Sequence, residues 1–381
     1  MEDRNAAPIE VSRITCCVHH QLSARITERL RDIGVASVVA ESGRTVRRRR
    51  TKPRFGKRRQ VVRVEDSPVD VLRVSVALDA AREVTEEIVR SAQMEIPGRG
   101  TVFTQDAVEH AGSGAPARIT AAPADDGGEV TLLSDLTLMT FVLSTAGSGE
   151  RVAEVALELG TGVPIITYGT GTGIRDRLGL LRITVPPEKE LVHLLVPAAD
   201  TDGLLRQLIE ENSLNRPGSG FVFCTAVREG LLDTRLLIGP QEHAATMEQV
   251  VAAIDKLSAG AGWRRRFSDD DGSGYRLIRD HTEISMLCPE ELLDRYVDAA
   301  REAGAMGATV SRVRQLSLDG SAAGDAARAR CVMCVPTPVA TAVVAALQAA
   351  DGGKSELDSV QTLGAPTLYS FQSQSPSATR S

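Results

Sequence analysis

PGRGTVF, residues 97–103, is the stretch that decides the expected fold. A glycine-rich turn leads here into an apolar strand, and the same pattern returns as RPGSGFVF at residues 216–223. Around each turn the chain shows one order of elements: a strand, a helix, two strands, a second helix and, after the turn, a last strand. Self-similarity of this kind indicates an internal repeat.

The elements are identified by short apolar runs typical of strands and by apolar residues at helical spacing. Leu22, Ile26, Leu30 and Ile33, for example, share one face of a predicted helix. In the first segment we expect strands at 14–20, 35–42, 69–78 and 100–108 and helices at 21–34 and 79–93. In the second we expect strands at 136–144, 163–173, 189–198 and 220–227 and helices at 149–160 and 200–212.

A third segment repeats the order without the glycine-rich turn. Its expected strands are 282–289, 308–318, 327–336 and 359–371, and its expected helices are 290–304 and 337–351. The predicted domains are a unit at 12–110, a linker at 111–130, a second unit at 131–238, a helical connection at 239–281, a degenerate unit at 282–372 and a disordered tail at 373–381.

These patterns resemble the PII signal-transduction family. The family has a G-x-G-x-[IV]-F turn before its last strand, and residues 98–103 and 218–223 match this turn. It also has a G-x-G-[basic] bend at the base of a long loop, the T-loop. YGTGTGIR (168–175) fits this bend, and ESGRTVR (41–47) fits it in part. The helix before the glycine turn opens on an acidic residue in the family, as it does here at Asp79 and Asp200.

The resemblance implies an α+β fold of tandem ferredoxin-like βαββαβ repeats. Three such units joined in one chain would form a pseudo-trimer, and pairing between chains would instead give a larger homo-oligomer. It also implies an adenine nucleotide, bound as an effector rather than as a tight cofactor, in clefts between units. The residues that would bind it are Gly43, Arg44, Gly98, Arg99, Gly100, Gly171, Thr172, Gly173, Arg175, Gly218, Ser219 and Gly220.

YGTGTGIRDRLGLLR, residues 168–182, has two interpretations. Glycines let backbone N–H groups approach an anion, and nearby arginines can neutralise it. The same composition suits a flexible turn. The spacing G-x-G-x-G is not the dinucleotide-binding fingerprint, and no Walker loop occurs in the chain.

Residues 45–63 form a strongly basic segment without an acidic residue. Within it, the expected partner-binding residues are Arg47, Arg48, Arg49, Arg50, Lys52, Arg54, Lys57, Arg58 and Arg59. The favoured hypothesis is docking to a target enzyme or membrane transporter, the alternatives being a solvated loop and nucleic acid. A formal net charge of −6 makes nucleic acid the least favoured of the three.

Composition excludes several classes of protein. The chain has 381 residues, 42% of them apolar, which suits packed domains, and no run of the 18 or so apolar residues that span a bilayer. With no apolar signal region either, we expect a cytoplasmic protein. The six cysteines lie in strand-like runs, and Cys331 and Cys334 fall on opposite faces of a strand, so we expect core packing and no metal site.

No catalytic constellation stands out, so we do not expect an enzyme. The sequence predicts a PII-like regulator that binds a nucleotide or another small anionic effector and signals through its loops, in nitrogen or carbon metabolism. The alternatives are a docking protein that acts through its basic loop and an enzyme on a three-repeat scaffold.

Overall fold

The structure is a computed structural model that describes residues 8–51, 61–112, 130–172, 188–238, 277–318 and 326–370. Residues 113–129 of the predicted linker, the predicted connection up to residue 276 and the predicted tail lie outside these ranges. So do Gly173, Arg175, Lys52, Arg54, Lys57, Arg58 and Arg59.

Each third of the chain contains strands and helices in the predicted order. The first has β1 (Ile9–His19), α1 (His20–Asp32), β2 (Ser37–Thr51), β3 (Val61–Ala77), α2 (Ala81–Ala92) and β4 (Gly100–Gly112). The second has β5 (Leu133–Leu143), α3 (Ser148–Glu158), β6 (Ile165–Gly171), β7 (Glu188–Pro197), α4 (Thr201–Glu211), β8 (Gly220–Leu231) and the short β9 (Leu237–Ile238). The third has β10 (Ile278–Cys288), α6 (Leu293–Glu302), β11 (Thr309–Ser317), β12 (Ala326–Pro336), α7 (Thr337–Asp351) and β13 (Ser359–Ser370).

The arrangement of these elements corrects the predicted fold. All thirteen strands of the described residues belong to one sheet, which is antiparallel except where β9 joins β2. The sheet closes on itself, because β2, β6 and β11 pair with one another, and so do β4, β8 and β13. The expected tandem ferredoxin-like βαββαβ repeats are therefore wrong, and a single closed sheet replaces them.

The physical reason lies at the strand edges. A segment on its own would leave two edge strands with unpaired N–H and C=O groups, which is costly and invites further pairing. Here each of those strands pairs with strands of the other two segments. Strand patterning in the sequence shows where strands occur, but not which distant strand completes an edge.

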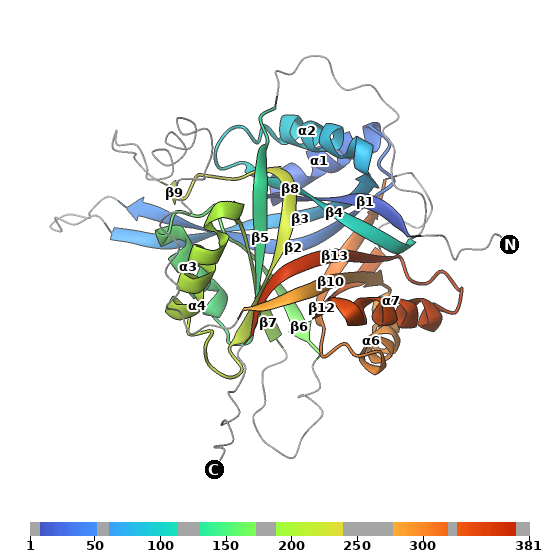
Figure 1. The fold of residues 1–381 in the computed structure, drawn as a ribbon. Helices are drawn as coiled ribbons and strands as arrows, with labels where there is room; N and C mark the ends of the chain where they lie inside the picture. The colour runs from blue at the N-terminus through green and yellow to red at the C-terminus, as the bar shows by residue number, and fades with distance from the viewer. Residues whose placement is uncertain are drawn as a thin grey trace, which may run out of the picture.

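Three helix pairs cover the outside of the closed sheet, with α1 and α2, α3 and α4, and α6 and α7 grouped at separate places around it (Figure 1). Each pair buries its apolar stripe mainly against the strands of its own third of the chain, as amphipathic helices do, and α3 also packs on β2. Ile26 of α1 and Ile88 of α2, for example, pack with Ile14 of β1. Three separate apolar cores result.

The inner face of the sheet is different in character. Side chains alternate between faces along a strand, so every second residue points inward. Small apolar clusters around Phe103, Phe223 and Val71 lie on the inside together with buried charged residues such as Arg13 and Glu283. The centre of the molecule therefore combines apolar and charged side chains.

The basic segment belongs largely to two long strands. β2 and β3 pair in register from Val39 and Arg73 out to Thr51 and Val61, and Figure 1 shows this hairpin extending away from the body of the sheet. Within the described residues, 45–51 and 61–63 of the basic segment are thus paired strand rather than the expected loop.

The six cysteines are all free, and all but the half-buried Cys334 are buried. Burial raises the pKa of the Cys331 and Cys334 thiols to about 12, which keeps them protonated and poorly nucleophilic. No cluster of three metal-ligating side chains occurs in the described ranges. Within the same ranges, no helix has the length and apolar character needed to cross a bilayer.

Candidate functional site

The glycine turn before β4 lines a small cavity at the junction of the first two thirds of the chain. Its walls come from the end of β1, the middle of β2 and β3, the turn with the start of β4, the residues just before β6 and the segment after β8. The cavity volume is about 40 Å³. The residues that line it are Cys17, Val18, His19, Thr45, Arg47, Ser67, Val69, Gly98, Arg99, Gly100, Thr101, Val163 and Asp233.

The Asp233 carboxylate occupies the part of this cavity where an external anion would be expected. Its Oδ1 accepts hydrogen bonds from the backbone N–H of Gly98 at 2.9 Å and of Arg235 at 2.9 Å. Its Oδ2 pairs with the guanidinium of Arg47 at 2.5 Å. The backbone N–H of Asp233 in turn donates to Thr101 Oγ1 at 3.0 Å. The glycine turn, β2 and the segment after β8 therefore meet at a single carboxylate.

Both members of this ion pair are buried, with side chains 10% (Arg47) and 2% (Asp233) exposed. Arg47 Nε has no hydrogen-bond partner among the described residues. A buried ion pair offsets its desolvation only if both partners remain, and loss of one leaves an uncompensated charge. The site therefore retains a strong preference for an anion at the position of the Asp233 carboxylate.

Backbone amides at a glycine turn together with a guanidinium are the donors that bind oxyanions. The volume of about 40 Å³ has room for a few atoms besides the carboxylate. An adenine nucleotide is far larger, so it does not fit while Asp233 holds the turn. Binding of a larger anion requires Asp233 and its segment to move away.

The predicted residues of the first T-loop base serve other contacts. Gly43 lies where β2 approaches β6, and a Cβ there would stand 2.8 Å from the carbonyl oxygen of Ile166. Arg44 donates from Nε to the Tyr168 hydroxyl at 2.8 Å and pairs with Asp66. Neither residue lines the cavity at the glycine turn.

The predicted residues of the second T-loop base lie at another junction, between the second and third parts of the chain. The N–H of Thr172 donates to Ala308 O at 2.8 Å, and Arg301 donates to the carbonyl of Thr172. Gly171 lies against the side chain of Lys189. These contacts connect the end of β6 to the third segment.

The turn itself packs beside the end of β5. Ser219 Oγ donates to the carbonyl of Arg216 at 2.7 Å, and the Ser219 carbonyl accepts from the Ser144 N–H at 3.2 Å. Gly218 has a positive φ of 77°. Anion binding by Gly171, Thr172, Gly218, Ser219 and Gly220 stays a prediction.

The described basic residues of β2 differ in their availability to a partner. Arg47 is buried against Asp233, whereas Arg48 lies 3.9 Å from Glu158 and Arg49 donates to Glu65 at 2.7 Å. The backbone of Arg50 pairs with that of Val62. Part of the charge of the basic segment is therefore used within the molecule.

No protein-family model matches the chain, and no curated protein matches it. Among solved structures, GlnK of B. subtilis, a PII protein, matches with a TM-score of 0.21 and 15% identity, over 26% of this chain and 84% of that chain. The structural similarity is thus weak.

Sequence reasoning missed Asp233, which gathers the contacts of this site. It lies in LLDTR, residues 231–235, beyond the last strand predicted for the second segment. No local pattern distinguishes it from the other acidic residues of the chain. Only the closure of the sheet places it beside a turn 135 residues earlier.

Proposed function

We propose that the protein is a regulatory binding protein whose effector is an anion, and that the effector replaces the Asp233 carboxylate at the glycine turn. The observation that supports this proposal is the carboxylate bound to Gly98 N–H and buried Arg47. A turn that binds a carboxylate by these donors also has the chemistry for a phosphate oxygen.

The exchange would reach the basic hairpin through β2. Arg47 is part of this strand, and the next N–H along it, that of Arg48, donates to Leu236 O at 2.8 Å. β9, four residues after Asp233, pairs with Arg48 and Arg49. An effector that binds the glycine turn better when Asp233 is released would therefore favour a second state of the protein. In that state β9 and the outer part of the β2–β3 hairpin would rearrange.

More specifically, we propose that the protein is a PII-like regulator. Its effector would be an adenine nucleotide, and the β2–β3 hairpin would bind an enzyme or a transporter. The support is the glycine-turn motif at 98–103 beside a buried arginine. The nucleotide's phosphates would contact the turn and Arg47, and its base would extend into the space that the segment after β8 vacates.

The test is calorimetric titration of the full-length protein and of Asp233→Ala with ATP, ADP, AMP, cyclic AMP and orthophosphate. The variant removes the internal competitor, so we expect its best ligand to bind at least about tenfold more tightly than it binds the unmodified protein, a difference of about 1.4 kcal/mol. The ligand should also raise the unfolding temperature of the variant, because it restores a charge beside Arg47.

Asp106→Ala is the matched control, because Asp106 lies on β4 with a side chain 55% exposed; its ligand affinity should equal that of the unmodified protein. Arg47→Gln should lose binding in either background. If Asp233→Ala does not fold, Asp233→Asn keeps the shape and removes the charge. Absence of binding of all five ligands to a folded Asp233 variant would overturn the proposal.

A further inference from the structure

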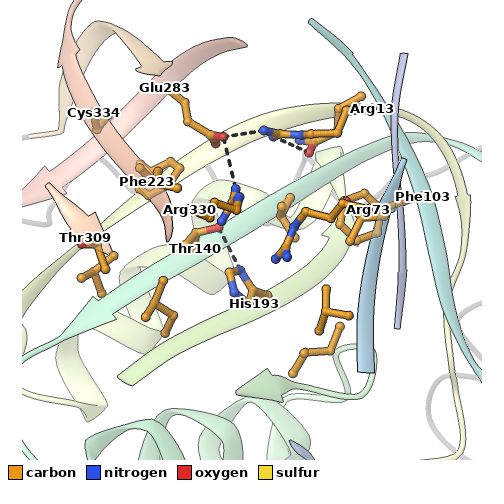
Figure 2. A pocket seen from close by; sticks show the side chains of 18 of the residues that line it. Arg13, Arg73, Phe103, Thr140, His193, Phe223, Glu283, Thr309, Arg330 and Cys334 are labelled. Atoms are coloured by element: carbon orange, nitrogen blue, oxygen red, sulfur yellow. Dashed lines mark hydrogen bonds and ion pairs between the residues drawn. The ribbon is translucent and has the colours of Figure 1, made fainter. Parts of the chain in front are cut away.

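A second cavity lies at the centre of the closed sheet, away from the glycine turn, and its largely apolar wall also carries charged side chains. Side chains from all three parts of the chain converge on it, including Arg13, Arg73, His193, Glu283 and Arg330 (Figure 2). Its volume is about 40 Å³. Neither the predicted effector site nor the proposed function uses these residues.

Two of the three guanidinium groups are closely paired. Arg13 Nη1 lies 2.8 Å from Glu283 Oε1, and its Nη2 donates to Gln105 Oε1 at 2.9 Å. Arg73 Nη1 lies 2.6 Å from Glu41 Oε2. Each of these arginines therefore has its own carboxylate.

Arg330 does not have a carboxylate of its own. Its nearest acidic oxygen among the described residues is Glu283 Oε1, at 4.0 Å, and Arg13 already binds that oxygen. Burial and the proximity of Arg73 lower the pKa of Arg330 to about 9, so the guanidinium remains charged at neutral pH. Glu41 and Glu283 oppose this lowering, but each of them is already paired with another arginine, so Arg330 is a largely buried cation that shares its carboxylates.

The other titratable group on this wall does not supply a negative charge. His193 lies between the hydroxyls of Thr140, at 3.3 Å, and Thr167, at 3.2 Å. Burial lowers its pKa to about 4, so the ring is neutral at neutral pH. Among the described residues, the guanidinium groups of Arg13, Arg73 and Arg330 face two carboxylates, those of Glu41 and Glu283, which leaves one excess positive charge in this group.

An uncompensated charge inside a protein is strongly unfavourable, and a bound counter-ion removes that cost. The cavity exceeds the minimum volume for a water molecule, about 10–15 Å³, but it is too small for a sugar or a base. Threonine hydroxyls on its wall, those of Thr15, Thr140 and Thr309, are suitable donors to an anion.

We propose that this central cavity binds one small monovalent inorganic anion, of the size of chloride or bromide, beside the guanidinium of Arg330. The anion would link the three parts of the chain, since Arg73 belongs to the first, His193 to the second and Arg330 to the third. It is a structural ligand of the closed sheet, separate from the effector at the glycine turn.

The test is thermal unfolding of the full-length protein at constant ionic strength, in sodium gluconate with increasing sodium bromide or chloride. Gluconate is too large for the cavity. We expect each halide to raise the unfolding temperature by several degrees with a saturable dependence on concentration. Arg330→Met should abolish this dependence, and Arg312→Met, at a side chain 87% exposed on β11, should retain it.

Crystals grown with bromide give a direct readout. An anomalous peak within hydrogen-bonding distance of Arg330 is expected in the unmodified protein and in Asp233→Ala, and none in Arg330→Met. If Arg330→Met does not fold, Arg330→Lys keeps the charge and should keep the peak. A halide-independent unfolding temperature, or a cavity without bromide, would overturn the proposal and leave the effector proposal unaffected.

Discussion

His193 illustrates how much the surroundings of one residue decide. The sequence places it in an apolar strand, where it has no obvious role. In the structure it faces the central cavity, hydrogen-bonded to two threonines and near Arg73, Arg330, Glu41 and Glu283. Desolvation is the largest effect on its pKa and the cations add to it, while the carboxylates act in the opposite direction.

The pKa of His193 predicts a pH dependence of stability. In the unfolded chain the imidazole binds a proton below about 6.5, whereas in the folded protein it stays neutral down to about 4. The unfolded state therefore gains protons first as the pH falls, and stability decreases from pH 6.5 to 4 by about 2–3 kcal/mol from this group. His193→Gln should make this decrease shallower in urea titrations.

The control is His20→Gln, because His20 is exposed at the start of α1; its profile should follow that of the unmodified protein. His19 and His110 also have lowered pKa values because of desolvation, so part of the slope remains in every variant. An unchanged profile for His193→Gln would contradict the assignment.

At the scale of elements, the two glycine turns define the entry of β4 and β8 into the sheet. Gly100 and Gly220 both have positive φ, 153° and 133°, and a Cβ at either would collide with a backbone carbonyl of the adjacent strand, at Cys17 or Val142. The matching motifs thus have a structural requirement that is independent of any bound anion.

Gly100→Ala should destabilise the protein by about 2–4 kcal/mol, because strain and overpacking coincide at this turn. Gly203 lies in α4 with open space where a Cβ would stand. Gly203→Ala should therefore stabilise the protein by about 0.5–1 kcal/mol. Chemical denaturation of the two variants measures both effects, and a neutral Gly100→Ala would show that the turn can relax.

At the scale of the whole molecule, the three parts of the chain depend on one another. Thr362 of β13 pairs with Val108 of β4, and Thr367 of β13 pairs with Cys224 of β8. The partner of Arg13, Glu283, is 270 residues away. Edge pairing and charge compensation are both completed only when the sheet closes.

A fragment of residues 1–112 contains β1 to β4 but lacks these partners. We expect it to self-associate through its open edges or to lack fixed structure, because unpaired edges and a buried unpaired arginine are both unfavourable. Sedimentation and NMR spectra of the fragment, compared with the full chain, test this. A well-dispersed spectrum from a monomer would contradict the expectation.

Prediction from sequence succeeded for local structure and for little else. The helix expected at 337–351 has the same bounds as α7, since 3.6-residue spacing and a flanking glycine are local signals. At the candidate site, the sequence showed the glycine turn but not the carboxylate that the turn binds. Asp233 supplies this carboxylate, and it reaches the turn only through the tertiary structure.

The sequence by itself determined the order of strands and helices, the apolar helix faces and the positions of the glycine turns, because each depends on residues within about 15 positions of one another. The tertiary structure decided that the strands form one closed sheet, that Arg47 faces Asp233 and that Arg330 lies in the centre and shares its carboxylates. Edge pairing and buried charge are properties of distant residues in contact, and no local pattern specifies which residues those are.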